Sequence, residues 1–439
     1  MVFIGPLSNI GLSRCHKRVG LRLRTDRRKY KIPDYFHTTP VLEVIGMYEE
    51  NTYHLQIRRN QVKFSKITSG SLAAALLVAL AIPVLSNSSA SAATDYSKVT
   101  SASQAGGLAG LAAACKKEGQ LNIIATPRDW ADYGVMMDGF TKAYGVKIDS
   151  ANPEAGSQDE INAAVANKGT SRSPDVFDLG TATAVKYLGK DTYSPYKVKL
   201  WNYIDGAALI SPNGEITPNY VGTLTIGYNS TLLGTITKLD DLFDPKFKGK
   251  VAINGDPMTS GTGLNSIFFI NKALGGTFDD ITKAVAWFKK LKDVGNFINV
   301  NPTAATIAQG STPVVVDNGY NAIAVQRKLA PAGVVWKSYT PVSLGGGYNS
   351  AISAWAPHPA CARLWLEYAL GETGAGIWAG GGATPRVWAW MVKTKRAPAS
   401  GIAVIGKNRI SADEATPAQA LAARAYLKTA WPEAVGVRN

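Results

Sequence analysis

The stretch LNIIATPRDWADYGVMMDGFTKAYGVKI, residues 121–148, decides the fold class. It begins with a short apolar run of strand type at 121–125 and ends with another at 146–148. Between these runs, apolar side chains at helical spacing predict an amphipathic helix that stops at Gly145. These side chains are Tyr133, Met136, Met137, Phe140 and Tyr144. A strand, a helix and a strand in this order predict a βαβ unit.

The alternation of strands and helices continues on both sides of this stretch. The long extended segment Tyr220–Asn229 has no helical period and predicts a first crossing between two halves of the molecule. Gly345–Gly347 predicts the return crossing, because glycine permits the backbone angles that a hinge needs. The remaining expected elements are helices at 108–117, 159–167, 239–242, 262–273, 284–291 and from 359, and strands at 175–178, 251–253, 313–317 and 334–336.

This pattern predicts an α/β fold with a mostly parallel sheet and two lobes that are joined by hinge crossings and enclose a cleft. One lobe is expected to comprise residues 93–222 with about 345–390, and the other residues 223–344. A helical segment at 391–439 completes the chain.

The residues before this region predict export. Lys63 and Lys66 precede an apolar run at 72–85, which is shorter than the roughly 20 residues of a membrane span. Small residues at 90–92 follow, so 62–92 is typical of a signal peptide and the mature chain is expected to begin near Ala93. Residues 1–61 are interpreted as an upstream extension, disordered or placed before the true translation start; an uncleaved anchor with a basic tail is the alternative.

Charge and cysteine usage exclude several classes of protein. Of the net charge of +15, a surplus of 8 positive charges lies in residues 1–92. The remaining positive charge is spread thinly over the rest of the chain, which argues against a nucleic-acid partner. Cys115 and Cys361 remain after the leader, either as one disulfide or as two buried thiols. The four histidines have no metal-ligand spacing, so neither a metal nor a cofactor is expected.

Several segments, in this order, resemble the type II periplasmic solute-binding proteins, the group that includes ferric-iron, thiamine, phosphonate and polyamine binders. Lys238 departs from the pattern, since the family often has Trp there. The segments are KKEGQLNI (116–123), FTKAYGVKI (140–148), PDVF (174–177), LDDLFDPKFKGKV (239–251), and HPACARLW (358–365) with EY (367–368) and GE (371–372). The resemblance implies an exported, monomeric protein that captures a small molecule for the membrane permease of an ABC importer.

In open sheets, ligands bind beyond the carboxyl ends of the strands, where helices begin. This rule nominates the turns after each expected strand, although the turn at 256–262 is equally an ordinary helix cap. The candidate ligand-binding residues are Arg128, Asp129, Trp130, Ser157, Asp178, Asp256, Thr259, Ser260, Thr262, Asp317, Tyr320 and Tyr348.

Carboxylates and aromatic rings in this set favour a polyamine-like organic cation as the ligand. Arg128 and the hydroxyl groups at 259–262 suit an anion such as a phosphonate. Ferric iron is less favoured, because the adjacent tyrosine pair of the iron binders that the sequence resembles is missing. No nucleophile, zinc-protease or nucleotide-binding motif occurs, so no catalytic residue is expected; a carboxylate-dependent hydrolase using Asp129 and Asp317 is the alternative class.

Overall fold

The computed structural model describes residues 94–408 and 412–438. Every described residue belongs to one compact unit, Ser88–Asn439. The expected signal peptide at 62–92, the extension at 1–61 and the mature start at Ala93 therefore lie outside the described residues. Within the described ranges, no helix combines the length and apolar character needed to cross a membrane.

The βαβ unit predicted at 121–148 is present. Strand β1 (Gln120–Ile124) pairs in parallel with β2 (Lys147–Ala151), and Leu121 lies opposite Ile148. Helix α2 (Tyr133–Tyr144) connects them and buries Tyr133, Met136, Met137 and Phe140, which confirms the predicted apolar stripe. Gly145 ends the helix at φ 68°, and its N–H donates to the Thr141 carbonyl. This left-handed backbone is the conformation for which glycine is preferred at a helix end.

The main sheet is assembled in the order β3-β9-β5-β7-β6, with three short strands attached. Only β6 and β7 run parallel; β3 with β9, β9 with β5, and β5 with β7 are antiparallel. The expected mostly parallel sheet is therefore wrong for this sheet, because the two crossing strands, β5 and β9, run back through its centre. The strands are β3 (Val176–Gly180), β4 (Tyr193–Ser194), β5 (Thr217–Asn229), β6 (Val251–Ile253), β7 (Val314–Asn318), β8 (Trp336–Tyr339), β9 (Gly345–Ser353) and β10 (Thr384–Pro385).

Strand β5 belongs to both lobes. Its first half, up to Thr223, pairs with β9 and β10, whereas its second half, from Leu224, pairs with β7 and β8. The crossing predicted at Tyr220–Asn229 is thus a continuous strand rather than a flexible link.

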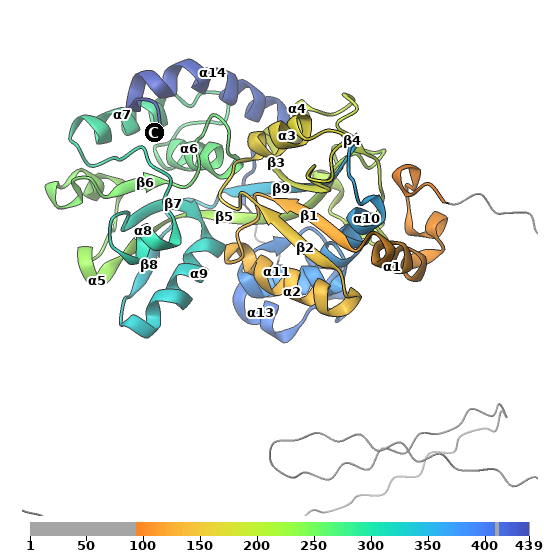
Figure 1. The fold of residues 1–439 in the computed structure, drawn as a ribbon. Coiled ribbons are helices and arrows are strands. Elements are labelled where there is room, and N and C mark those ends of the chain that lie inside the picture. The colour runs from red at the N-terminus through yellow and green to blue at the C-terminus, as the bar shows by residue number, and fades with distance from the viewer. Residues whose placement is uncertain (1–93, 409–411, 439) are drawn as a thin grey trace, which may run out of the picture. The chain divides into compact units, whose positions relative to one another are not determined.

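Helices cover the two halves of this sheet separately (Figure 1). The first lobe is built around a hydrophobic cluster to which α1, α2, α10 and α11 contribute, and the second around a cluster from α6, α7 and α14. The helices are α1 (Gly107–Glu118), α3 (Ser157–Ala166), α4 (Thr181–Lys186), α5 (Ser230–Leu233), α6 (Gly261–Ala273), α7 (Thr282–Asp293), α8 (Ala304–Ala308), α9 (Gly319–Leu329), α10 (Pro359–Ala369), α11 (Glu372–Gly381), α12 (Trp388–Lys393), α13 (Ala399–Ile405) and α14 (Pro417–Val435). The boundaries 93–222 with 345–390, and 223–344, stay a proposal that this packing supports.

Helix α14 packs against the second lobe although it lies far along the chain from it. Leu427 and Trp431 are fully buried there, and burial of such side chains contributes about 1.5–3 kcal/mol each. The helix also contacts α4 of the first lobe. The segment 391–439 was expected to be helical, and its described part includes α13 and α14.

The glycine triplet Gly345–Gly347 opens β9 and does not act through unusual backbone angles, since none of the three has a positive φ. The predicted hinge role of these glycines concerns a change of backbone angles between two states, so it stays a prediction. A Cβ on Gly346 would lie 2.5 Å from Asn265 Nδ2, and one on Gly347 would lie 2.7 Å from Arg386 Nη2. Side chains pack closely over the crossing strand here, and they would have to move to accommodate a larger residue.

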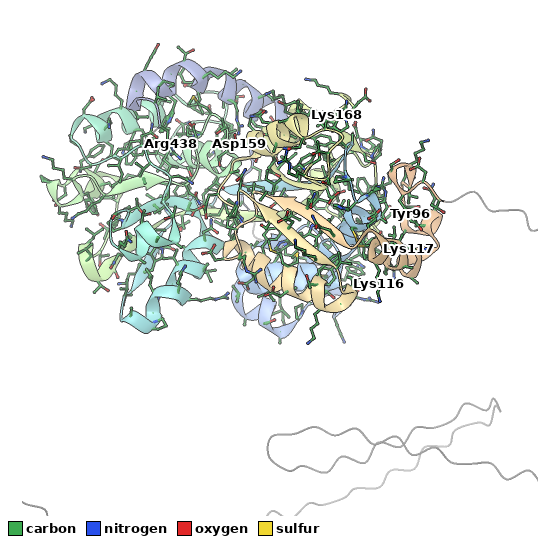
Figure 2. All side chains as sticks on the ribbon, viewed as in Figure 1. Tyr96, Lys116, Lys117, Asp159, Lys168 and Arg438 are labelled. Carbon is green, nitrogen blue, oxygen red and sulfur yellow. A yellow bond between two sulfur atoms is a disulfide. The ribbon has the colours of Figure 1, made fainter. Side chains whose placement is uncertain are left out.

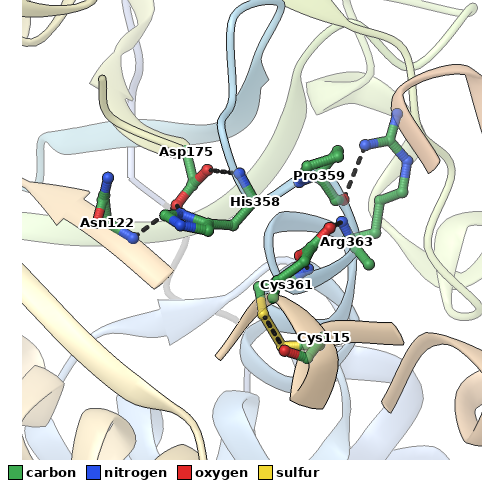
Figure 3. Close-up of a disulfide and its surroundings, with 9 residues drawn as sticks. Cys115, Asn122, Asp175, His358, Pro359, Cys361 and Arg363 are labelled. Carbon is green, nitrogen blue, oxygen red and sulfur yellow. Dashed lines mark hydrogen bonds and ion pairs between the residues drawn. A yellow bond between two sulfur atoms is a disulfide. The ribbon is translucent and has the colours of Figure 1, made fainter. Parts of the chain in front are cut away.

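A disulfide joins Cys115 of α1 to Cys361 of α10, which decides between the two alternatives left by the sequence (Figure 3). The beginning of α10 is held by further contacts. The Glu118 carboxylate accepts hydrogen bonds from the Ala360 and Cys361 N–H groups. His358 Nδ1 lies 2.8 Å from the buried Asp175 carboxylate. Side chains far apart in sequence therefore anchor the start of α10 to α1 and to the residue that precedes β3.

Candidate functional site

A cavity of about 250 Å³ lies between the two lobes. Its first-lobe wall comes from the turn before α3, the first turn of α3 and the middle of β3. Its second-lobe wall comes from the turn between β6 and α6, with Asn301 and Arg438. The lining residues are Ala125, Trp130, Pro153, Glu154, Ala155, Gly156, Ser157, Asp159, Glu160, Asp178, Asn254, Gly255, Asp256, Thr259, Ser260, Asn301, Tyr348 and Arg438.

Several of the residues nominated from the sequence meet in this cavity, because strand ends and helix starts from both lobes face it, as expected for an α/β fold. They are Trp130, Ser157, Asp178, Asp256, Thr259, Ser260 and Tyr348. Asp129 and Asp317 line a neighbouring cavity of about 60 Å³, which shares Trp130, Glu154 and Asn254 with the larger one.

Three nominated residues lie outside both cavities. Arg128 is exposed, and its Nη2 donates to Asp138 Oδ2 over 2.6 Å on the outer surface. Thr262 is fully buried behind the wall and forms a 2.7 Å hydrogen bond with the Tyr348 hydroxyl. Tyr320 is also buried and packs its ring 5.7 Å from that of Trp130.

The buried carboxylate of Asp178 is surrounded by donors. It accepts hydrogen bonds from the Tyr220 hydroxyl at 2.7 Å, from Asn219 Nδ2 at 2.6 Å and from the Tyr133 hydroxyl at 3.0 Å. Burial raises the pKa of Asp178 to about 6, and these hydrogen bonds oppose the rise. A cation next to Asp178 would favour its ionised form.

Glu160 was missed in the sequence, where it is one polar residue of an expected helix. It lies in the first turn of α3, is 1% exposed and accepts a 2.8 Å hydrogen bond from the Asp178 N–H. Burial raises the pKa of Glu160 well above its ordinary value. Glu160 and Ser157 lie within one turn of the same helix start. The rule that residues at helix starts line the site, which nominated Ser157, could therefore have nominated Glu160 as well.

Glu154, Asp159, Asn254, Asn301 and Arg438 were missed as well. Asp159 caps α3, because its carboxylate accepts a hydrogen bond from the Gly156 N–H at 2.9 Å. In the sequence, an acidic residue at this position is therefore typical of an ordinary helix start. Arg438 follows α14 and reaches the cavity only because that helix packs on the second lobe; Figure 2 labels Asp159 and Arg438, which belong to opposite walls. No local sequence signal identifies Arg438.

Aromatic rings form one side of the cavity. Trp130 and Tyr348 line it, with ring centroids 5.9 Å apart at 78°. Tyr220 stacks behind Tyr348 at 5.5 Å and 15°. The faces and edges of these rings provide a rigid surface that suits methylene groups or a cationic head.

Of the three hydroxyl groups expected to suit an anion, those of Ser260 and Thr262 are engaged in contacts within the protein. Ser260 Oγ accepts from the Gly263 N–H at 3.3 Å and caps α6. Thr262 Oγ1 bonds the Tyr348 hydroxyl and accepts from Asn318 Nδ2 at 3.0 Å. This turn also carries Asp256, which would repel an anion. Within residues 94–408 and 412–438, no group of three or more His, Cys, Asp or Glu residues is arranged to hold a metal ion.

Solved structures with low sequence identity share this fold. A putative spermidine/putrescine ABC transporter from Listeria monocytogenes has a TM-score of 0.53 and 16% identity, over 71% of this chain and 99% of that chain. The periplasmic binding protein AfuA from Actinobacillus pleuropneumoniae, with fructose-6-phosphate bound, has a TM-score of 0.53 and 19% identity, over 73% and 99%. Iron-bound HitA from Pseudomonas aeruginosa has a TM-score of 0.51 and 16% identity, over 72% and 99%.

These likenesses confirm the two-lobed periplasmic-binding-protein type II fold. The sequence matches none of the curated proteins with which it was compared. A family model described as "Bacterial extracellular solute-binding protein" matches residues 171–401, which is more than half of the 439 residues. Family and fold are those of transport proteins rather than enzymes. The chain therefore belongs to the bacterial extracellular solute-binding proteins, the components of ABC transporters that bind small molecules outside the cytoplasm.

Proposed function

We propose that the interlobe cavity captures an organic cation with amine groups, of the polyamine type, and that the closed protein delivers it to a membrane permease. The observation that carries this proposal is the excess of carboxyl groups over basic groups in the lining. The carboxyl residues Glu154, Asp159, Glu160, Asp178 and Asp256 line the cavity with a single guanidinium, that of Arg438. Ammonium groups form charge-assisted hydrogen bonds with carboxylates, which are about twice as strong as neutral ones.

The neighbouring smaller cavity extends the acidic lining. Asp129 and Asp317 lie in it, beyond Trp130 and Glu154. Carboxyl groups are thus present in both of the cavities that Trp130 lines. This arrangement supports an elongated ligand, whose methylene groups would pass the aromatic side chains while its amines reach carboxyl groups at either end.

Transport follows from closure of the lobes. A ligand that contacts both walls favours the closed state, and a permease that recognises this state accepts the loaded protein. Export through the signal peptide expected at 62–92, action as a monomer and recognition by an ABC permease belong to the same proposal. A phosphonate or sugar-phosphate binder and a ferric-iron binder are the competing functions.

A thermal-shift screen followed by calorimetry tests the ligand class, using putrescine, spermidine, thiamine, a phosphonate, fructose-6-phosphate and ferric citrate. We expect the amines to raise Tm, because ligand at a hundredfold excess over Kd stabilises a protein by about 2.7 kcal/mol. Stabilisation by the phosphonate, the sugar phosphate or the ferric salt without any response to amines would overturn the proposal.

Matched variants locate the effect. Asp256→Asn keeps an oxygen for the 2.8 Å hydrogen bond from the Met258 N–H but removes the charge. It should weaken spermidine binding about tenfold, which is about 1.4 kcal/mol. Asp293→Asn is the control, since Asp293 is exposed and pairs with Lys289 away from the cavity. Equal affinities of both variants and the wild type would remove Asp256 from the site.

A further inference from the structure

The charges of the cavity are divided unequally between its two walls. The first-lobe wall carries Glu154, Asp159, Glu160 and Asp178 and no basic side chain. The second-lobe wall carries one acid, Asp256, and one base, Arg438, among neutral polar groups. A ligand that only carried positive charge would therefore face a guanidinium on one side.

Arg438 is fixed in place by neutral acceptors. Its Nε donates to Asn299 Oδ1 at 3.2 Å, its Nη1 to Asn301 Oδ1 at 3.3 Å and its Nη2 to the Ile253 carbonyl at 3.3 Å. Asn299 Nδ2 also donates to the Gly436 carbonyl at 2.7 Å, which ties down the backbone just before Arg438. The guanidinium is thus positioned at the end of β6 before any ligand arrives.

Within residues 94–408 and 412–438, no carboxylate lies at ion-pair distance from this guanidinium. Among the described residues, Arg438 forms no ion pair, and each terminal nitrogen keeps one N–H without a protein acceptor. Burial lowers the pKa of Arg438, and the charge of Asp256 only partly opposes this. A partly buried charge without a counter-ion is unfavourable, so an anionic group at this position would stabilise the protein.

Arg438 does not serve to neutralise the acids of the opposite wall. Asp178 is already held by two tyrosine hydroxyls and an amide, and Glu160 accepts the Asp178 N–H. The terminal nitrogens of Arg438 each keep one N–H, and guanidinium N–H groups form charge-assisted hydrogen bonds with carboxylate oxygens.

We infer that the ligand is dipolar: its amine faces the acidic first-lobe wall, and a carboxylate on the same molecule pairs with Arg438. This inference rests on the proposed function and narrows it from organic cations to amines that carry a carboxylate. The guanidinium selects between a molecule that carries a carboxylate and one that carries an ammonium group in its place, because it attracts the carboxylate and repels the ammonium group.

Calorimetry with two matched probes tests this. One is spermidine, and the other is a spermidine analogue in which a carboxylate replaces the terminal aminomethyl group of the aminopropyl arm. Arg438→Gln should weaken binding of the analogue about tenfold or more, the loss expected for a charge-assisted contact. Binding of spermidine should stay unchanged or become tighter, because a like charge is removed.

Two further variants separate charge from folding. Arg438→Lys keeps the charge without the guanidinium and should recover part of the affinity for the analogue. Lys428→Gln, an exposed residue of α14, removes one positive charge outside the cavity and should change neither affinity. An unchanged Tm of ligand-free Arg438→Gln would show that the second lobe is intact.

Three results would overturn the inference. In the first, Arg438→Gln weakens both probes equally, as expected if Arg438 only holds the wall together. In the second, the wild type binds spermidine but not the analogue, so the dipolar ligand fails while the proposed cation binding stands. In the third, neither amine binds, and the proposed function fails with it.

Discussion

Gly180, the last residue of β3, and Gly261, the first residue of α6, touch backbone to backbone between the two lobes. A Cβ on Gly180 would lie 2.6 Å from the Gly261 Cα, and a Cβ on Gly261 would lie 2.8 Å from the Gly180 Cα. Next to this contact, the Gln158 N–H donates to the Thr259 carbonyl at 3.3 Å. These contacts fix the distance between the two walls of the cavity, since backbone atoms cannot turn aside as a side chain can.

Gly180→Ala should therefore hold the walls apart and weaken spermidine binding by about tenfold, although it changes no polar side chain of the cavity. Calorimetry measures the affinity, and X-ray scattering should show a larger radius of gyration for the ligand-free variant. Gly206→Ala is the control, because a Cβ there meets no atom within 4 Å. If Gly180→Ala bound spermidine as the wild type does, the walls would not depend on this contact.

The stability of the ligand-free protein should fall as the pH rises from about 4 to about 7. Burial raises the pKa of Asp178 to about 6 and that of Asp317 to about 7, both above their unfolded value. Their protonated forms are therefore favoured in the folded state, and this stabilisation is lost as the pH rises through the folded pKa. For Asp178, the two-unit shift corresponds to about 3 kcal/mol of unfolding free energy.

Urea denaturation over this pH range measures the effect. Asp178→Asn should flatten the decline between about pH 4 and about pH 6. It should keep the remaining decline, to which Asp317, Glu160 and His358 contribute because their pKa values are raised as well. Asp95 and Asp241 do not interfere, because hydrogen bonds lower their pKa values and their contributions change at more acidic pH. A stability that rose between about pH 4 and about pH 7 in the wild type, and equally in Asp178→Asn, would contradict the assignment.

Reduction of the Cys115–Cys361 disulfide should lower the free energy of unfolding by about 2–5 kcal/mol, because the bond closes a long loop in the unfolded chain. The sequence separation of the two cysteines is 246. Urea titrations with and without a reductant measure the difference, and the double variant Cys115→Ser, Cys361→Ser should no longer respond to the reductant.

The fold of α10 should survive this change. Its first N–H groups remain bound to Glu118, and the contact between His358 and Asp175 does not involve sulfur. Far-UV circular dichroism of the double variant should match that of the wild type. A reductant that left the wild-type unfolding midpoint unchanged would show that the bond does not restrain the unfolded chain.

The elements were predictable where the pattern was local. The stripe from Tyr133 to Tyr144 identifies α2, since a helix that buries one face needs apolar residues at this spacing. The strand expected at 334–336 begins later, at Trp336, because pairing with β5 rather than local apolar character sets its start. The direction of the crossing strands was not predictable, because no local pattern distinguishes the parallel from the antiparallel neighbour of a fully buried strand.

The residues of the site, like the elements of the fold, were predictable only in part. Trp130, Ser157, Asp178 and Asp256 stand at strand ends or helix starts, so topology alone nominated them, and the structure brings them to one cavity. Asp317 stands at such a position too, but it lines the smaller neighbouring cavity. The sequence does not show how far each turn extends toward the cavity.

By itself, the sequence determined the alternation of strands and helices, the two crossings and the acidic and aromatic character of the turns, because these depend on residues that are neighbours along the chain. Only the tertiary structure decided that Cys115 meets Cys361, that Gly180 touches Gly261 and that Arg438 enters the cavity. Each of these contacts joins residues many positions apart, and it exists because α14 and the two crossing strands bury apolar surface against elements that the local pattern cannot specify.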